Sequence, residues 1–382
     1  MRAKASRLSA GGSERANHPL QRRHGLAGRA GATFTCRTRV GRGDGQAVIA
    51  GIDLGGTKIA ACVANESGVV ARARAPVPRS GDERTIARAM LALLDGCCRE
   101  AGVSSEALQA VGVAACGPFE GLAGQLASAA PNLCGGLSPE SDLPNRWMRV
   151  ALEAPLLEAL GGRPLSIAND AQAALFAEYR FGALRGVSHG AYLTWSTGIG
   201  VGLMLDGRLV RGKSGNAGHA GHSMVPSAQS LRPRCGCGNE GDVESLAGGA
   251  ALARAWGGET LDLFNVCRRG ESAAVALVDG ALDAIADLVY NLFVTLDLER
   301  IAIGGGLFCS QSDVLLPALR ARLFESGRYP GMRGMLAGAS VVAVSDPART
   351  AELGALCLVL PQSWQLRWSA EFPAEAVAAI AA

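Results

Sequence analysis

The stretch Ala47-Val-Ile-Ala-Gly-Ile-Asp-Leu-Gly-Gly-Thr-Lys58 decides the fold. Residues 47–53 form a short apolar run that predicts a strand, and residues 59–64 predict a second one. Gly55 and Gly56 lie between the two runs and predict a tight turn. Glycines in such a turn let consecutive backbone N–H groups approach a phosphate. The stretch therefore predicts a hairpin whose turn can bind phosphate.

Two side chains of this hairpin add to the phosphate chemistry. Thr57 supplies a hydroxyl donor, and Asp53, at the end of the first strand, is placed to hold a hydrated Mg²⁺. A glycine-bearing hairpin turn is also common in α/β proteins that bind no phosphate. This loop alone therefore leaves both interpretations open.

The chain repeats the pattern further along. Thr194-Trp-Ser-Thr-Gly-Ile-Gly-Val-Gly202 lies within a second strand–turn–strand unit over 190–210, and Gly304-Gly-Gly306 follows a third apolar strand at 300–303. Three glycine loops in this order, each after a strand, favour phosphate and nucleoside binding over ordinary turns. The repeat also predicts an internal duplication, with two α/β domains and a ligand cleft between them.

Periodicity places the other elements and the domain boundaries. Helices are expected over 84–101, 170–181, 244–256, 271–296 and 350–360, and strands over 109–115, 166–168 and 340–345. We expect a disordered basic leader at 1–46, an N-terminal α/β domain at 47–167 completed by a C-terminal helix at about 345–365, a larger α/β domain at 168–344, and a tail at 366–382.

Composition excludes several classes of protein. The 382 residues are 48% hydrophobic, which rules out wholesale disorder, and no run approaches the roughly 18 to 20 apolar residues of a membrane span. Residues 1–46 hold a net charge of +8, which leaves −5 for the rest of a chain whose total is +3. An acidic body with a basic leader is not typical of a nucleic-acid-binding domain. Eleven cysteines, an odd number and mostly inside apolar runs, indicate a reducing compartment, and we expect the cytoplasm.

Asn169-Asp170 ends a predicted strand and opens a predicted helix. A carboxylate at this point can accept the proton of an attacking hydroxyl, while a neighbouring amide holds that hydroxyl. Both residue types also favour the N-cap of a helix, so a purely structural role is the alternative. Pro131-Asn132 is in the same way either a turn or a ligand-binding loop.

A third group of residues suggests a metal site. Gly218-His-Ala-Gly-His222 is followed by Cys235-Gly-Cys237 and then by Asp242 and Glu244. Zinc prefers four nitrogen, sulfur or oxygen ligands, and two cysteines with an upstream histidine fit that preference. The alternative is a metal-free loop with two thiols.

One formal motif is rejected. Gly207-Arg-Leu-Val-Arg-Gly-Lys-Ser214 fits the P-loop pattern G-x-x-x-x-G-K-[ST]. A P-loop needs a helix directly after it, whose N-terminus faces the phosphates. Gly215-Asn-Ala-Gly-His follows instead, which is typical of a loop.

Taken together, these motifs resemble the ROK family of sugar kinases and repressors, over about residues 47–360. The resemblance implies an actin-like, ribonuclease H-like ATPase fold with two α/β domains and an interdomain cleft. It implies that ATP and Mg²⁺ are the cofactors and that ATP is bound by Asp53, Gly55, Gly56, Thr57, Lys58, Thr197, Gly198, Gly200, Gly304, Gly305 and Gly306.

The resemblance also implies roles for the polar residues. It makes Asp170 the catalytic base and gives sugar contacts to Asn132, Asn169, His219, His222 and Glu244. In the family a histidine and three cysteines bind structural zinc. Here the ligands would be His222, Cys235, Cys237 and Asp242, with the aspartate at the third cysteine position.

The residue type at position 219 indicates which sugar is the substrate. Most ROK glucokinases have a glutamate at this position, whereas the His-x-Gly-His run is similar to that of bacterial N-acetylmannosamine kinases. The expected activity is ATP-dependent phosphorylation of the 6-hydroxyl of a hexose or N-acetylhexosamine, with N-acetylmannosamine first and glucose or N-acetylglucosamine as alternatives. A ROK repressor is disfavoured because residues 1–46 are too few and too glycine-rich for a helix-turn-helix. We expect a homodimer with a sugar substrate and no specific nucleic-acid or membrane partner.

Overall fold

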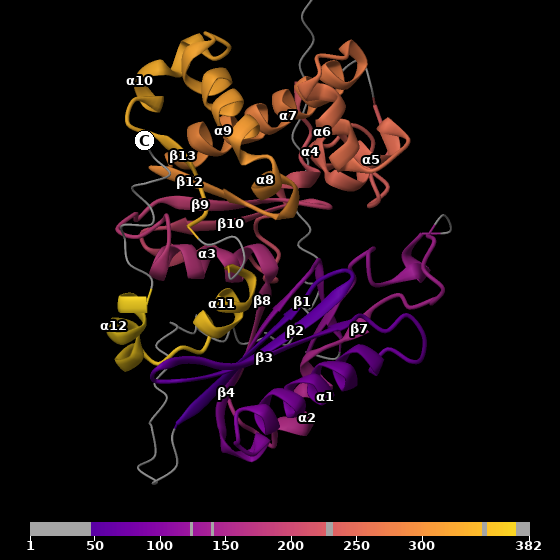
Figure 1. The fold of residues 1–382 in the computed structure, drawn as a ribbon, viewed down its shortest axis with the longest axis vertical. Coiled ribbons are helices and arrows are strands. Elements are labelled where there is room, and N and C mark those ends of the chain that lie inside the picture. Colours follow the sequence, from indigo (N-terminus) through magenta and orange to yellow (C-terminus); the bar gives the residue numbers. More distant parts are fainter. Residues whose placement is uncertain (1–46, 123–124, 139–140, 227–231, 346–349, 372–382) are drawn as a thin grey trace, which may run out of the picture. The chain divides into compact units, whose positions relative to one another are not determined.

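Two five-stranded sheets with matching strand arrangements form the frame of the chain (Figure 1). The computed structural model describes residues 47–122, 125–138, 141–226, 232–345 and 350–371, all within one compact unit, Arg37–Ala382. The predicted leader at 1–46 and the end of the predicted tail, 372–382, lie outside the described residues.

The first sheet has the order β3-β2-β1-β4-β8. β1, β2 and β3 pair antiparallel, whereas β1, β4 and β8 pair parallel. The bounds are Val48–Leu54 for β1, Lys58–Asn65 for β2, Gly68–Pro76 for β3, Leu108–Ala115 for β4 and Leu165–Asn169 for β8. The quoted stretch is therefore a hairpin, as predicted.

The second sheet repeats this arrangement with the order β11-β10-β9-β12-β13. β9 and β10 form an antiparallel hairpin, and β9, β12 and β13 pair parallel. The bounds are Gly190–Trp195 for β9, Ile199–Leu205 for β10, Arg208–Leu209 for β11, Arg300–Gly304 for β12 and Ser340–Ala343 for β13. The repeat in the sequence thus corresponds to a repeat in topology.

A small antiparallel sheet was not expected from the sequence. It consists of β5 (Phe119–Leu122), β6 (Gln125–Ser128) and β7 (Val150–Ala151). These strands are too short to show a clear two-residue period, so sequence patterning gives no signal for them.

Alternation along β1 explains how the first sheet is covered on both faces. Ile52 and Leu54 point to the core beneath α1 (Thr85–Glu100) and α2 (Glu153–Leu160), whereas Ile49 points to the core beneath α11 (Thr350–Cys357). Successive side chains of a strand point to opposite faces, so a strand covered on both faces is apolar throughout.

The remaining helices belong mainly to the second sheet. α3 (Asp170–Phe181) packs on β9, β10 and α11, and the other helices lie on the opposite face (Figure 1). They are α4 (Val243–Ala247), α5 (Gly249–Trp256), α6 (Thr260–Arg268), α7 (Ser272–Leu296), α8 (Gly306–Ser310), α9 (Ser312–Arg320) and α10 (Arg333–Leu336). The helix expected over 244–256 is divided, because Gly248 has an extended backbone. Among the described helices, none combines the length and apolar character that crossing a bilayer requires.

Two expected boundaries differ from the structure. The predicted division between residues 167 and 168 falls inside β8, which belongs to the first sheet. Residues 366–371, assigned to a tail, lie in α12 (Gln362–Glu371), where Trp364 and Trp368 are buried and the Trp368 indole donates to the Asn65 carbonyl. Two isolated tryptophans in a polar segment do not give a helical period, which is why the helix was missed.

Glycines allow α11 to approach the first sheet at backbone distance. A Cβ on Gly112 of β4 would lie 1.9 Å from the carbonyl oxygen of Ala355, and a Cβ on Gly51 of β1 would lie 2.9 Å from Leu356 Cγ. On α11 itself, Gly354 lies against the backbone of Ala173 in α3. Side chains at these positions would force α11 away from both neighbours.

Gly112→Ala is expected to lower the free energy of unfolding by about 2 to 4 kcal/mol, because the new methyl group meets backbone atoms that cannot rotate away. Gly96→Ala, inside α1, is the matched control, because a Cβ there would lie 4.0 Å from the side chain of Arg99. It should stabilise by about 0.5 to 1 kcal/mol. Urea unfolding measures both. Equal effects of the two variants would contradict the packing.

Candidate active site and metal centre

Two carboxylates lie at the carboxyl ends of the parallel strands. Asp53 pairs in register with Ala114 of β4, which pairs with Ala168 of β8, so Asp170 lies two residues beyond that row. Burial, followed by the negative charge of Asp170, raises the pKa of Asp53 to about 7. Burial also raises the pKa of Asp170, against the opposing effects of the Ala171 N–H and of His219. Sheet register therefore brings two weakly acidic carboxyl groups together.

Asn169 and Asp170 occupy different positions at the start of α3. Asn169 is the N-cap of α3, and its Oδ1 accepts from the Ala171 N–H at 3.0 Å. Asp170 is the first helical residue, and its Oδ1 accepts from the same N–H at 2.8 Å. Asn169 thus meets the capping interpretation, and the catalytic role of Asp170 remains a prediction.

His219 lies beside this pair. Its Nδ1 is 3.0 Å from the Asn216 carbonyl oxygen, and because a carbonyl only accepts, Nδ1 carries the proton. In the neutral ring Nε2 is then an acceptor. A Cβ on Gly117, just after β4, would lie 3.0 Å from His219 Nε2 and 3.4 Å from Asn169 Nδ2. Gly117 thereby lets the end of β4 lie against both polar side chains.

Asn132 lies against the first glycine loop, held there by a residue that the sequence did not indicate. A Cβ on Gly56 would be 2.5 Å from Asn132 Nδ2. The Arg79 guanidinium donates to the Gly56 carbonyl at 2.5 Å and to the Asn132 carbonyl at 2.9 Å. Thr57 and Lys58, in contrast, are exposed. Arg79 follows β3 in an ordinary Pro-Arg-Ser segment, which carries no motif that could have identified it.

The second and third glycine loops are neighbours. Gly304 pairs in register with Thr194, and a Cβ on Gly305, whose φ is +95°, would lie 2.5 Å from the Trp195 carbonyl. A further segment joins them, because the N–H groups of Gly249 and Ala250 donate to the carbonyls of Ser196 and Thr197. The sequence missed this segment by placing it inside a helix. Thr197, Gly198, Gly200 and Gly304–Gly306 thus form one glycine-lined surface.

Glu244 connects that surface to the cysteine loop. Its Oε2 accepts from the Ile199 N–H at 2.8 Å, and its Oε1 is 3.8 Å from Cys235 Sγ. The structure therefore places Glu244 between the β9–β10 turn and the candidate metal ligands. The sugar contact expected of it remains a prediction.

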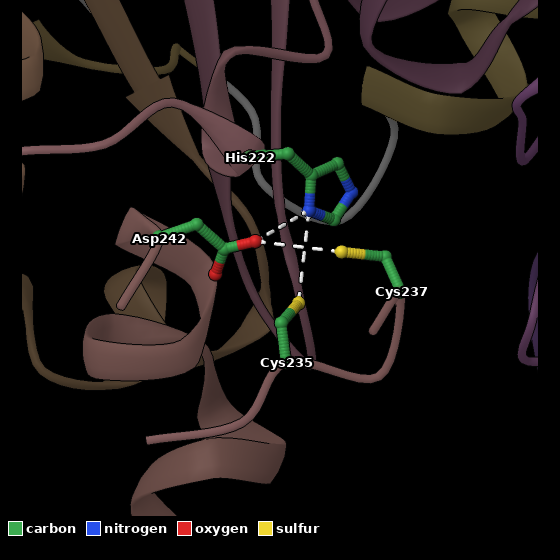
Figure 2. Close-up of side chains that lie close together, drawn as sticks. All are labelled: His222, Cys235, Cys237 and Asp242. Carbon is green, nitrogen blue, oxygen red and sulfur yellow. Dashed lines mark hydrogen bonds and ion pairs between the residues drawn. The ribbon is translucent and has the colours of Figure 1, made fainter. Parts of the chain in front are cut away.

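The four expected metal ligands converge, as Figure 2 shows. One ligand atom from each of His222, Cys235, Cys237 and Asp242 lies within 4.8 Å of the others. His222 Nδ1 is 3.1 Å from Asp242 Oδ2 and 3.7 Å from Cys235 Sγ, and Cys237 Sγ is 3.5 Å from Asp242 Oδ2. The second ring nitrogen of His222 points away from the group (Figure 2).

The three distances of 3.1, 3.7 and 3.5 Å are close to those expected around tetrahedral zinc. Zinc–ligand bonds of about 2.0 to 2.3 Å place neighbouring ligand atoms about 3.3 to 3.8 Å apart. Although burial alone would raise it, hydrogen bonds from His222 and the Ser245 N–H lower the pKa of Asp242 to about 2, so the carboxylate is ionised. The other Asp242 oxygen caps α4 at 2.8 Å from the Ser245 N–H. The aspartate can therefore supply a ligand atom while holding the helix.

Comparison with known proteins places these residues in a wider context. The ROK family profile matches residues 49–360. N-acetylmannosamine kinase from Citrobacter koseri is 32% identical over 309 residues, which are 77% of this chain and 98% of that protein. The ROK hexokinase from Thermus thermophilus superposes with a TM-score of 0.63 at 31% identity, covering 81% of this chain and 97% of that one. A ROK glucokinase from Streptomyces griseus, solved with glucose and AMPPNP, superposes with a TM-score of 0.60 at 26% identity. The match covers 81% of this chain and 97% of that one.

Proposed function

The chain belongs to the ROK family, and we propose that it is an ATP-dependent kinase that phosphorylates the 6-hydroxyl of N-acetylmannosamine. The observation that carries this proposal is the carboxyl group of half-buried Asp170, which lies beside Asn169 and His219 at the start of α3 and has a raised pKa because of burial. The similarity to N-acetylmannosamine kinases over most of the chain supports the choice of sugar.

Asp170 acts as the general base. Phosphoryl transfer needs an oriented hydroxyl, a place for its proton and neutralisation of phosphate charge, and little covalent chemistry from the protein. A base works best when its pKa lies near the operating pH, and burial moves the pKa of Asp170 in that direction. The amides of Asn169 and Asn132 hold the sugar hydroxyls in this scheme, and Arg79 holds Asn132 against the first glycine loop.

ATP lies along the glycine loops. The first two glycine loops bind the phosphates, and the third contacts the nucleoside. The first loop consists of Asp53, Gly55, Gly56, Thr57 and Lys58, the second of Thr197, Gly198 and Gly200, and the third of Gly304, Gly305 and Gly306. Asp53, half-buried at the end of β1, would hold hydrated Mg²⁺, and the bound ion would neutralise phosphate charge.

His219 selects the sugar. Its Nε2 is an acceptor, suited to an amide N–H or a hydroxyl near C2, and it lacks the negative charge of the glutamate in glucokinases. His222 and Glu244 complete the sugar contacts from the cysteine loop. Glucose and N-acetylglucosamine remain the alternative substrates.

Zinc bound to His222, Cys235, Cys237 and Asp242 is structural in this proposal. His222 would bind through Nδ1, so its ring would be fixed with Nε2 directed away from the metal. The described cysteines are free thiols, which suits a protein of the reducing cytoplasm. We also propose a homodimer, which light scattering after gel filtration would measure.

The function is tested by ADP release with N-acetylmannosamine, N-acetylglucosamine, glucose, mannose, fructose and allose. The largest kcat/KM is expected for N-acetylmannosamine. If no sugar stimulates ADP release, the kinase proposal is wrong; if another sugar ranks first, only its substrate is wrong.

Asp170→Asn is expected to lower kcat by about 10²- to 10⁴-fold, with sugar binding largely retained, because the variant keeps the shape but cannot accept the proton. In wild type, kcat/KM should fall as the pH falls, because protonated Asp170 cannot accept a proton. Since the pKa of Asp170 is raised, this fall should be centred above pH 3.8, the pKa of an ordinary aspartate. Asp262→Asn, an exposed aspartate of α6, is the control. Near-normal turnover of Asp170→Asn would leave this carboxylate without a catalytic role.

His219→Glu is expected to reduce kcat/KM for N-acetylmannosamine and to improve the relative rate with glucose. When a site loses the hydrogen-bond partner of one substrate group, kcat/KM for substrates that have this group falls, often by orders of magnitude. Steady-state kinetics on both sugars, with zinc content measured on the same samples, gives the answer. Loss of zinc together with uniform loss of activity would mean that His219 only supports the metal loop.

Purified protein is expected to contain one zinc ion per chain, which elemental mass spectrometry would measure. Asp242→Asn keeps an oxygen that can cap α4 but loses the anionic ligand, and should weaken zinc binding by at least about tenfold. Asp242→Cys should bind zinc at least as tightly as wild type. Unchanged zinc affinity in Asp242→Asn would exclude this carboxylate from the ligand set.

A further inference from the structure

A pocket lies beside the edge strand β8, and its lining includes none of the residues proposed above for catalysis, sugar binding or ATP binding. Its volume is about 330 Å³. It is lined by Phe119, Leu126, Ile167, Ala168, Gln172, Arg211, Gly212, Lys213, Ser214 and Gly215. The volume is at the lower end of the range of small-molecule sites, about 300 to 1,000 Å³, and suits a ligand with one ring.

The two sides of this pocket differ in chemistry. Phe119, Leu126 and Ile167 form an apolar wall, whereas Arg211, Lys213 and Ser214 form a polar one. None of the residues that line it is acidic, so the side chains give the pocket a net positive charge. A ring with an attached anionic group matches both walls.

Arg211 is fixed in the wall. Its guanidinium donates to the Ile167 carbonyl at 3.3 Å, on the edge strand of the first sheet. Burial lowers the pKa of Arg211, which means that its charge is partly removed from water.

The polar wall coincides with the rejected P-loop match. Gly207–Ser214 has the P-loop spacing, but the structure has turns and no helix over 210–219. Gly212 and Gly215 have φ of +70° and +83°, and these turns direct the segment along the pocket. Lys213 and Ser214 thus line this pocket, to which none of the glycine loops of the proposed nucleotide site contributes.

Hydrogen bonds connect the pocket to the candidate active site. The Gln172 amide of α3 donates to the carbonyls of Gly215 and Ala217, at 3.1 and 3.0 Å. Asn216 exchanges two hydrogen bonds with the backbone of Phe119, and its own carbonyl accepts from His219. The segment that lines the pocket is thus the one that positions His219.

We propose that this pocket binds a monosaccharide phosphate, with the phosphate on Arg211, Lys213 and Ser214 and the sugar ring against Phe119 and Leu126. The ligand is of the same chemical class as the product of the proposed reaction, but the binding does not depend on that reaction. The pocket is a second site for such a compound, separate from Asp170 and the glycine loops.

Isothermal titration calorimetry with the full chain tests this assignment. The protein is first saturated with N-acetylmannosamine and AMPPNP, and glucose 6-phosphate is then titrated in. One equivalent is expected to bind, and inorganic phosphate should bind at least tenfold more weakly because it leaves the apolar wall uncovered. No binding to the saturated protein would overturn the proposal, and equal affinity for inorganic phosphate would overturn the assignment to a sugar phosphate.

Variants separate this pocket from the catalytic site. Lys213 is exposed, so the Lys213→Met variant should fold normally. The substitution is expected to weaken glucose 6-phosphate binding at least tenfold. Arg208→Met, an exposed arginine of β11 that does not line the pocket, is the control and should bind as wild type does. Unchanged binding in Lys213→Met would contradict the site. If the protein fails to bind N-acetylmannosamine and AMPPNP, the proposed function fails, while the Lys213→Met comparison still tests the pocket.

Discussion

The parallel pairing of β1, β4 and β8 is the constraint on which the rest of the site depends. Because the three strands run the same way, they end at one edge of the first sheet, and the chain segments that leave them lie side by side. Asp53, Gly117 and Asp170 come from these three ends. Tight packing of α11 on Gly51 and Gly112 keeps one face of these strands covered. Partial burial at the strand ends raises the pKa of both carboxyl groups. The raised pKa values that suit proton transfer are therefore consequences of sheet geometry.

The second half of the molecule supplies the other two glycine loops of the proposed ATP site. The hairpin β9–β10, the strand β12 and the Gly248–Gly249 step bring the backbone of three glycine segments together. Glu244 joins this surface to the cysteine loop, where four candidate ligand atoms lie within 4.8 Å of one another. Zinc in that loop would fix Glu244 and His222 at the same time. A structural metal can in this way determine the shape of a sugar site without contacting the sugar.

The sequence predicted most of the frame because its signals are local. Hairpin glycines, apolar strands and the 170–181 helix are each specified by neighbouring residues, and the structure has them. Contacts between distant segments carried no such signal. Arg79 bonds to Gly56 and Asn132, and two tryptophans of α12 pack in one core cluster with α3 and α11. Neither contact was expected. The short strands β5 to β7 and the division of α4 from α5 at Gly248 were missed for a related reason, since a few residues cannot display a period.

The central claim is that Asp170 directs phosphoryl transfer from ATP to the primary hydroxyl of a sugar. The most direct measurement is proton-coupled ³¹P NMR of a reaction containing the protein, Mg-ATP and N-acetylmannosamine. Phosphate on the 6-hydroxyl is attached to a CH₂ group, so the account predicts a new phosphomonoester triplet that grows with ADP and is nearly absent with Asp170→Asn. A doublet, from phosphate on a secondary hydroxyl, or release of inorganic phosphate with no ester signal, would contradict it.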